Sequence, residues 1–210
     1  MVKHIFLAAM LLMGTACSAQ TTKLPKPNMQ RQTLSVMESF QQRKSTRSYS
    51  SKLLSAQDLS DLLWATIGVN RDNGNLTAPT AMNRQEILLY VFTDKEVCSY
   101  DPKTHSLTKV ADGDHRDIVA GRQEFAKTAP VSLLMVADMG KFGSDNEHAR
   151  WMVGTDVGIV TQNINLFCAA ANLATVTRGT MDQQAIQKLL GLKENQIPVI
   201  NNPVGYMSEK

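Results

Sequence analysis

A cluster of cations and hydroxyl groups occupies residues 43–49, which read Arg-Lys-Ser-Thr-Arg-Ser-Tyr. Cationic donors form charge-assisted hydrogen bonds, and a planar guanidinium can bind two oxygens of one phosphate. Arg43, Lys44, Ser45 and Arg47 are therefore candidate phosphate ligands. The alternative is a solvated basic surface, which is the commoner role of such a cluster.

A second polar segment, residues 78–85, reads Ala-Pro-Thr-Ala-Met-Asn-Arg-Gln and precedes the apolar run 86–92. Proline at its start predicts a rigid loop ahead of a strand. The carboxamide of Asn83 can donate and accept hydrogen bonds at once, which suits the polar edge of a heteroaromatic ring. The candidate ring contacts in this loop are Pro79, Thr80, Met82, Asn83 and Gln85. An ordinary turn is the alternative.

Together the two segments resemble the nitroreductase-like flavoproteins. In that family an opening Arg-Arg-Ser-x-Arg-x-[Phe/Tyr] segment holds the FMN phosphate, and a Pro-Ser-x-x-Asn-x-Gln segment lies along the isoalloxazine ring. This chain has Lys44 for the second Arg and Thr80 for the Ser, so it keeps the charge and the hydroxyl. The resemblance runs from about Phe40 to Met207. It is closest to the branch that contains the thiazole/oxazole-forming peptide dehydrogenases, which shares the turn at 100–105 and the segment 113–116.

The resemblance implies an α+β fold, a three-layer α/β/α sandwich in which helices flank a central, mostly antiparallel sheet. It also implies FMN as the cofactor and a homodimer built around a central helix. Arg178 and Gly179 match the family segment whose backbone approaches the flavin ring. Arg178 would stabilise the reduced flavin, or it is a surface cation at a strand end. The flavin carries the chemistry, so no catalytic side chain is expected.

The activity that this resemblance implies is ping-pong hydride or electron transfer through the flavin to or from a small substrate. The chain has no Gly-x-Gly-x-x-Gly fingerprint, so NAD(P)H as donor would have to stack directly on the flavin. Two alternatives remain: a flavin enzyme that uses O2 without nicotinamide, and a flavin-binding electron carrier without turnover.

The amino-terminal residues 1–19 have the pattern of a signal peptide, with a basic start, a short apolar stretch and a Cys17-Ser18-Ala19 cleavage site. They predict export to the periplasm, or membrane anchoring if Cys17 carries a lipid. Residues 20–35 are rich in Thr, Lys, Pro and Gln and predict a flexible leader. Residues 36–210 are long enough for one domain with its own core.

The net charge argues against nucleic acid as the main partner. The formal charge is +3 for the whole chain and +2 without the signal peptide, which is too small a positive excess for a typical nucleic-acid-binding protein. Cys98 and Cys168 are expected to be buried and unpaired, although an exported protein could join them. The isolated His105, His115 and His148 are expected to be surface residues and predict no metal site.

The helices and strands that would position the two segments are predicted from apolar spacing and capping signals. The longest predicted helix, 147–173, is apolar on nearly every side from Val157 onward, and Gly154 and Gly158 would let another backbone approach it closely. Gln162 and Asn163 within this helix are either buried amides or ligand contacts. The predicted helices span 55–67, 115–126, 147–173 and 182–190, and the predicted strands span 87–92, 97–100, 107–110, 131–137 and 173–177.

Overall fold

The computed structural model describes residues 20–208, which form one seven-stranded sheet. Every neighbouring pair of strands is antiparallel, and the strand order is β1-β4-β3-β2-β5-β7-β6. The strands are β1 (Thr21–Lys23), β2 (Ile87–Phe92), β3 (Glu96–Asp101), β4 (Ser106–Asp112), β5 (Val131–Asp138), β6 (Leu173–Thr175) and β7 (Gln196–Tyr206).

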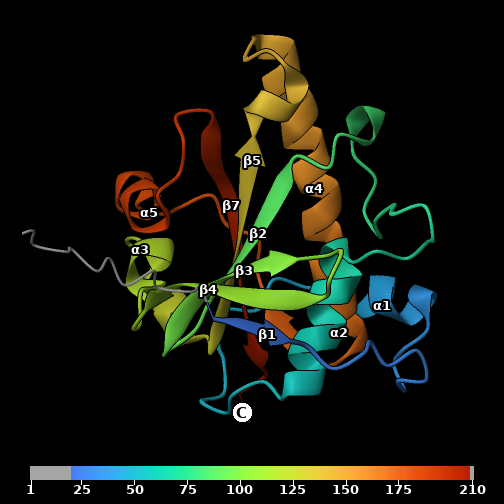
Figure 1. Cartoon of the computed structure of the whole chain (residues 1–210). Helices are drawn as coiled ribbons and strands as arrows, with labels where there is room; N and C mark the ends of the chain where they lie inside the picture. Colours follow the sequence, from blue (N-terminus) through green and yellow to red (C-terminus); the bar gives the residue numbers. More distant parts are fainter. Residues whose placement is uncertain (1–19, 209–210) are drawn as a thin grey trace, which may run out of the picture.

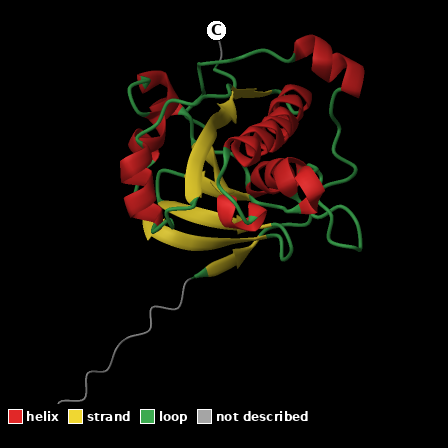
Figure 2. Ribbon diagram, turned by 90° about the horizontal axis from the view of Figure 1, so that it is seen from above, coloured by secondary structure: helices red, strands yellow, loops and turns green. Residues whose placement is uncertain are grey.

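Helices cover both faces of this sheet, which gives the three layers that the family resemblance implies (Figures 1 and 2). Helices α2 and α4 lie on one face and α3 and α5 on the other. The α-helices are α1 (Val36–Gln42), α2 (Ala56–Ile67), α3 (Arg116–Ala120), α4 (Glu147–Ala170) and α5 (Gln183–Leu190), and the short 3-10 helices are η1 (Ala81–Asn83), η2 (Glu124–Thr128) and η3 (Met139–Phe142).

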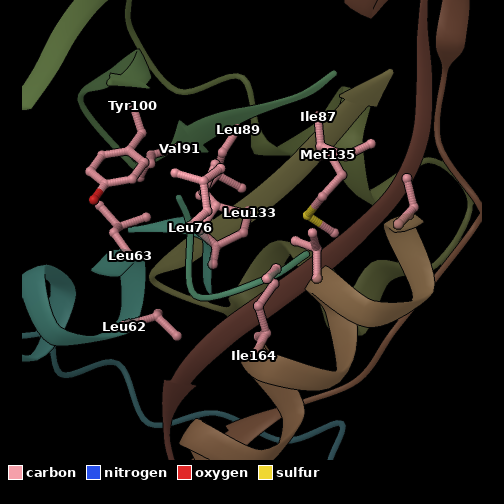
Figure 3. Close-up of a cluster of buried hydrophobic side chains, with 14 of the residues drawn as sticks. Leu62, Leu63, Leu76, Ile87, Leu89, Val91, Tyr100, Leu133, Met135 and Ile164 are labelled. Carbon is pink, nitrogen blue, oxygen red and sulfur yellow. The ribbon is translucent and has the colours of Figure 1, made fainter. Parts of the chain in front are cut away.

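The main core lies between the sheet and the pair α2 and α4 (Figure 3). Leu62 and Leu63 of α2 and Ile164 of α4 are completely buried against Leu89 and Leu133 of the two central strands. Apolar burial of this extent is the dominant favourable contribution to folding. On the other face, Phe92 and Leu134 of the same two strands are buried with Ile186 of α5. The central strands β2 and β5 are therefore packed on both faces, and the loops at their ends start from fixed positions.

Most predicted elements are confirmed, but the predicted helix 115–126 is interrupted. Gly121 ends α3 with a φ of 56°, and the chain then continues as η2. Glycine adopts this conformation at little cost, whereas other residues are strained there. Apolar spacing shows only that Val119 and Ala126 are both buried, and it does not register the break between them.

The expected flexible leader, residues 20–35, is packed on the domain in the structure. Strand β1 pairs with β4, and the backbone amide of Asn28 donates to Asp61 of α2 at 2.8 Å. Arg31 forms ion pairs with Asp58 and Asp61 at 2.5 and 2.9 Å. Composition pointed to disorder because it counts polar residues, whereas here the polar residues pair with specific carboxylates of α2.

Helix α4 buries one face and leaves the other open. A side chain added at Gly154 or Gly158 would meet no atom within 4 Å, and Trp151 on the same helix is 67% exposed. Within a single chain the apolar part of this helix therefore buries only one face. No helix in the described part of the chain is long and apolar enough to cross a membrane.

Both remaining cysteines are free and buried, as predicted. Cys98 lies on β3 and Cys168 on α4, and burial raises the pKa of both thiols, that of Cys98 to about 12. Neither thiol is poised to react. His105 departs from expectation: it is half-buried, and its ring bonds the hydroxyls of Tyr100 and Ser60 at 2.8 and 2.7 Å.

Candidate functional site

The basic segment 43–47 follows α1 and lies beside the carboxyl end of the sheet's last strands. The Thr46 amide donates to the carbonyl of Thr175 in β6 at 2.9 Å, and Tyr49 forms a bridge with Met207 beyond β7. The Tyr49 hydroxyl donates back to the Thr46 carbonyl at 3.1 Å. The sheet therefore holds the backbone of this segment while its cationic side chains project outward.

The cations of this segment have unused hydrogen-bonding capacity. Arg43, Lys44 and Arg47 are exposed, and none of them forms an ion pair or a side-chain hydrogen bond with another residue in the range 20–208. Arg47 is also positioned by an aromatic contact, since its guanidinium carbon lies 5.9 Å from the centre of the Phe125 ring. With the exposed hydroxyl of Ser45, they provide the donors that a phosphate requires.

Arg178 has a structural role that neither of its predicted readings described. Its side chain is 5% exposed, and it donates to the carbonyls of Val119 and Ala120 at 3.3 and 2.6 Å. It also donates to Gln123 and Asn201, both at 2.7 Å. This guanidinium joins α3 to β7 through four of its five N–H donors, so it is a buried structural group and not a surface cation.

Gly179, the next residue, is exposed, and a side chain added there would meet nothing within 4 Å. It lines an open cavity of about 700 Å³ together with Thr180, Arg122 and Lys127. Lys127 belongs to η2, the same short helix whose Phe125 contacts Arg47. The structure thus brings 43–47, Gly179 and two further cations to one side of the molecule. Arg122 and Lys127 were not predicted as site residues, because isolated surface cations carry no spacing signal.

The polar loop 79–85 has an unusual backbone. Met82, Asn83 and Gln85 have φ values of 53°, 51° and 49°, a left-handed conformation that is uncommon outside glycine. The Asn83 carboxamide donates to Asn75 at 3.0 Å and accepts from Gln85 at 3.3 Å. Pro79, Met82 and Asn83 are exposed, so this face of the loop is accessible.

A buried carboxyl pair lies beneath this loop. Glu86 is completely buried, and Asp156 of α4 is 3% exposed. Asp156 accepts a hydrogen bond from the Ala81 amide at 2.9 Å, whereas neither oxygen of the Glu86 carboxylate has a partner among the described residues. Glu86 opens the apolar run 86–92 and was not predicted as a site residue, although a single charge in such a run was the available signal.

The basic segment and the polar loop lie at opposite ends of the sheet (Figure 1). Segment 43–47 is held beside Thr175, because the Thr46 amide donates to the Thr175 carbonyl. Thr175 and Val131 both pair with Val204, so the segment is level with Val131, where β5 begins. The polar loop is level with Ala137, near the end of β5, because Ala137 pairs with Ile87. At about 3.4 Å per residue, roughly 20 Å of strand separates them. A single chain therefore does not bring its two predicted flavin-binding segments together.

The two amides within α4 have different partners. Asn163 donates to the carbonyls of Ala65 and Thr66 at the end of α2, at 3.1 and 3.4 Å, so it is a packing amide. Gln162 is half-buried and accepts from Asn165 at 3.4 Å.

Comparisons with known proteins agree with this architecture. The sequence pattern of the nitroreductase family matches residues 40–206. A Methanocaldococcus jannaschii protein named "putative nitroreductase" is 29% identical over 180 residues, which cover 80% of this chain and 88% of that protein. A crystal structure with the same description, from Ralstonia eutropha, has a TM-score of 0.84 and 30% identity, and 90% of each chain is covered.

More distant structures share the fold alone. A Clostridium acetobutylicum protein described as a "putative NADH oxidase" superposes with a TM-score of 0.57 at 22% identity, over 84% of this chain and 89% of that chain. The family match covers most of the sequence, and the sheet order, the flanking helices and the exposed basic segment lie within it. This chain belongs to the nitroreductase family.

Proposed function

We propose that this protein is an FMN-dependent oxidoreductase that transfers hydride or electrons through the flavin to or from a small substrate. The observation that carries the proposal is the exposed segment 43–47, whose three cations form no ion pair or side-chain hydrogen bond within the described chain. An uncompensated cluster of this kind suits a phosphate dianion. When bound, FMN would supply the hydride-transfer chemistry.

The residues of the chain would bind and orient this cofactor. Arg43, Lys44, Ser45 and Arg47 would hold the phosphate, and the open backbone at Gly179 would lie against the ring. Loop 79–85 would offer Asn83 to the polar edge of the flavin once this amide exchanges its contact with Asn75. Arg178 would act indirectly, by fixing the strand end from which Gly179 projects.

A homodimer would bring these parts together. Because the basic segment and the polar loop lie at opposite ends of β5 within one chain, a flavin that contacts both requires the loop of a second copy. The open face of α4, with Gly154, Gly158 and the exposed Trp151, supports this proposal because a partner helix could approach it closely. Val36, Met37 and Phe40 of α1, a helix packed on α4, add exposed apolar surface.

Three finer points are proposals of the same kind. NAD(P)H is the donor if the protein meets it, and an O2-using enzyme or an electron carrier are the alternatives. The likeness to thiazole/oxazole-forming peptide dehydrogenases rests only on the sequences of residues 100–105 and 113–116. Export rests on the sequence of residues 1–19, which lie outside the described residues, and lipidation at Cys17 would tether the protein to a membrane.

An absorbance spectrum of the purified protein tests the proposal. We expect a bound flavin that denaturation releases as FMN, that NADH reduces and that a nitroaromatic compound reoxidises. Failure to bind FMN even in excess, or recovery of FAD alone, would refute it. Bound FMN that reacts with neither compound would instead favour the electron carrier or another donor.

A further inference from the structure

The Glu86 carboxyl group is in an environment where an unpaired, ionised carboxylate would be strongly unfavourable. Its side chain is completely buried, and neither oxygen accepts a hydrogen bond from a described residue. Burial of an ionised group without donors is strongly unfavourable, so such groups are normally paired or neutral. Glu86 also directly follows loop 79–85 and precedes β2, so its position is coupled to the course of the loop.

Among residues 20–208, Asp156 of α4 is a partner of suitable chemistry, since its carboxyl group adjoins that of Glu86. One Asp156 oxygen, Oδ2, accepts from the Ala81 amide within the loop at 2.9 Å. Two ionised carboxylates are both acceptors and repel each other. A single proton on one of them turns this contact into a hydrogen bond and removes one of the two buried charges.

Other charged groups around the pair are occupied elsewhere. Lys141 of η3 donates to the Gln85 carbonyl, and Arg84 donates to the Lys141 carbonyl while lying over the Phe142 ring. Asp138 at the end of β5 accepts from the Gly140 amide and from a glutamine side chain. None of these groups gives Glu86 a hydrogen bond, although the charge of Lys141 favours its ionised form.

We propose that Glu86 and Asp156 share one proton and act as a positioning pair that holds loop 79–85 in its left-handed course. Protonated Glu86 donates to Asp156, and Asp156 in turn fixes the Ala81 amide next to Met82 and Asn83. The role of the loop in flavin binding rests on the function proposed above, whereas the effect of the pair on the loop does not require flavin. Loss of the shared proton places two charges beneath the loop and releases it.

The protonation behaviour of Glu86 supports this geometry. Burial is the largest cause, and with the adjoining Asp156 carboxylate it raises the pKa of Glu86 to about 7. The shared proton is therefore present at pH 6 and largely absent at pH 8.

Hydrogen exchange of the Ala81 amide, corrected for the intrinsic pH dependence of exchange, tests the proposal. In the wild type we expect protection to fall about ten-fold between pH 6 and pH 8, as the protonated fraction of Glu86 falls. In Glu86→Gln the carboxamide permanently supplies the donor, so protection should stay constant over this range. Glu194→Gln, an exposed glutamate after α5, is the matched control and should behave as the wild type does.

Equal pH dependence in Glu86→Gln and the wild type would overturn the proposal. If Glu86→Gln does not fold, NMR titration of the Glu86 carboxyl carbon in the wild type decides instead. Titration near pH 7 that moves to lower pH in Asp156→Asn supports the pair, and titration near the ordinary value of 4.5 overturns it. Both measurements are made without added FMN, so a failure of flavin binding would leave them unaffected and would count only against the proposed function.

Discussion

Arg178 shows how a residue singled out for chemistry can serve structure instead. Its guanidinium donates to two backbone carbonyls of α3 and to the side chains of Gln123 and Asn201. Arg178→Met should lower the free energy of unfolding by about 3 kcal/mol, because these buried acceptors lose their donor. Chemical denaturation without flavin measures this. Arg122→Met, at an exposed position, should change it little, and equal stability of the two variants would contradict the structural role.

Arg47, unlike the buried Arg178, has an exposed side chain and forms no ion pair with a described residue. Arg47→Ala should weaken FMN binding by about 1.5–3 kcal/mol, the typical value of a hydrogen bond to a charged group, and should hardly alter stability. Fluorescence titration with FMN gives the affinity. Lys193→Ala removes a cation near the far end of α5 and serves as the charge control. If Arg47→Ala binds FMN as the wild type does, segment 43–47 is only a solvated surface.

Glu86 should make stability depend on pH in the direction opposite to that of most carboxylates. Its folded pKa of about 7 lies above the ordinary value of 4.5, so the unfolded chain loses this proton at lower pH than the folded chain does. Stability should therefore fall as pH rises from about 4.5 to about 7, by about 3 kcal/mol from this group, and level off above. Urea denaturation should show that Glu86→Gln lacks this component; an identical fall in the variant would refute it.

At the scale of elements, the leader 20–35 is the clearest test of packing. Arg31 pairs with Asp58 and with the buried Asp61, and its guanidinium lies 5.6 Å from the centre of the Phe167 ring. Arg31→Ala should destabilise the domain by about 1–3 kcal/mol, because Asp61 stays buried without its cation. Thermal denaturation measures the loss, and Lys26→Ala, an exposed leader cation without an ion pair, is the control. A flexible leader would leave both variants as stable as the wild type.

Elements with local signals could be predicted from the sequence. Ser55 caps α2 by accepting from the Asp58 amide, and Asp182 and Gly191 delimit α5 in the same local way. Contacts between distant segments could not be predicted. Arg178 bonds the carbonyl of Val119, 59 positions earlier, and Asp156 lies 70 positions after Glu86. No local sequence pattern predicts contacts between residues so far apart.

At the scale of the whole molecule, the candidate site was predicted as residue types but not as one place. Segment 43–47 and Gly179 lie on one side of a single chain, whereas loop 79–85 lies at the other end of β5. A family sequence motif gives the order of binding segments and does not state which copy supplies each one. We propose that a second copy supplies the missing segment, because α4 has an open face that a partner helix could approach.

Complementation between two defective chains tests this shared site most directly. Arg47→Ala disables the phosphate side, and Asn83→Glu places a bulkier anion on the exposed loop; each variant alone should bind little FMN at concentrations that saturate the wild type. After unfolding and refolding together in equal amounts, half of the dimers should be mixed. Each mixed dimer combines one wild-type basic segment with one wild-type loop, so about a quarter of all sites should recover full affinity. No recovery, despite native mass spectrometry that shows mixed dimers, would place both segments of each site in one chain and contradict the shared site.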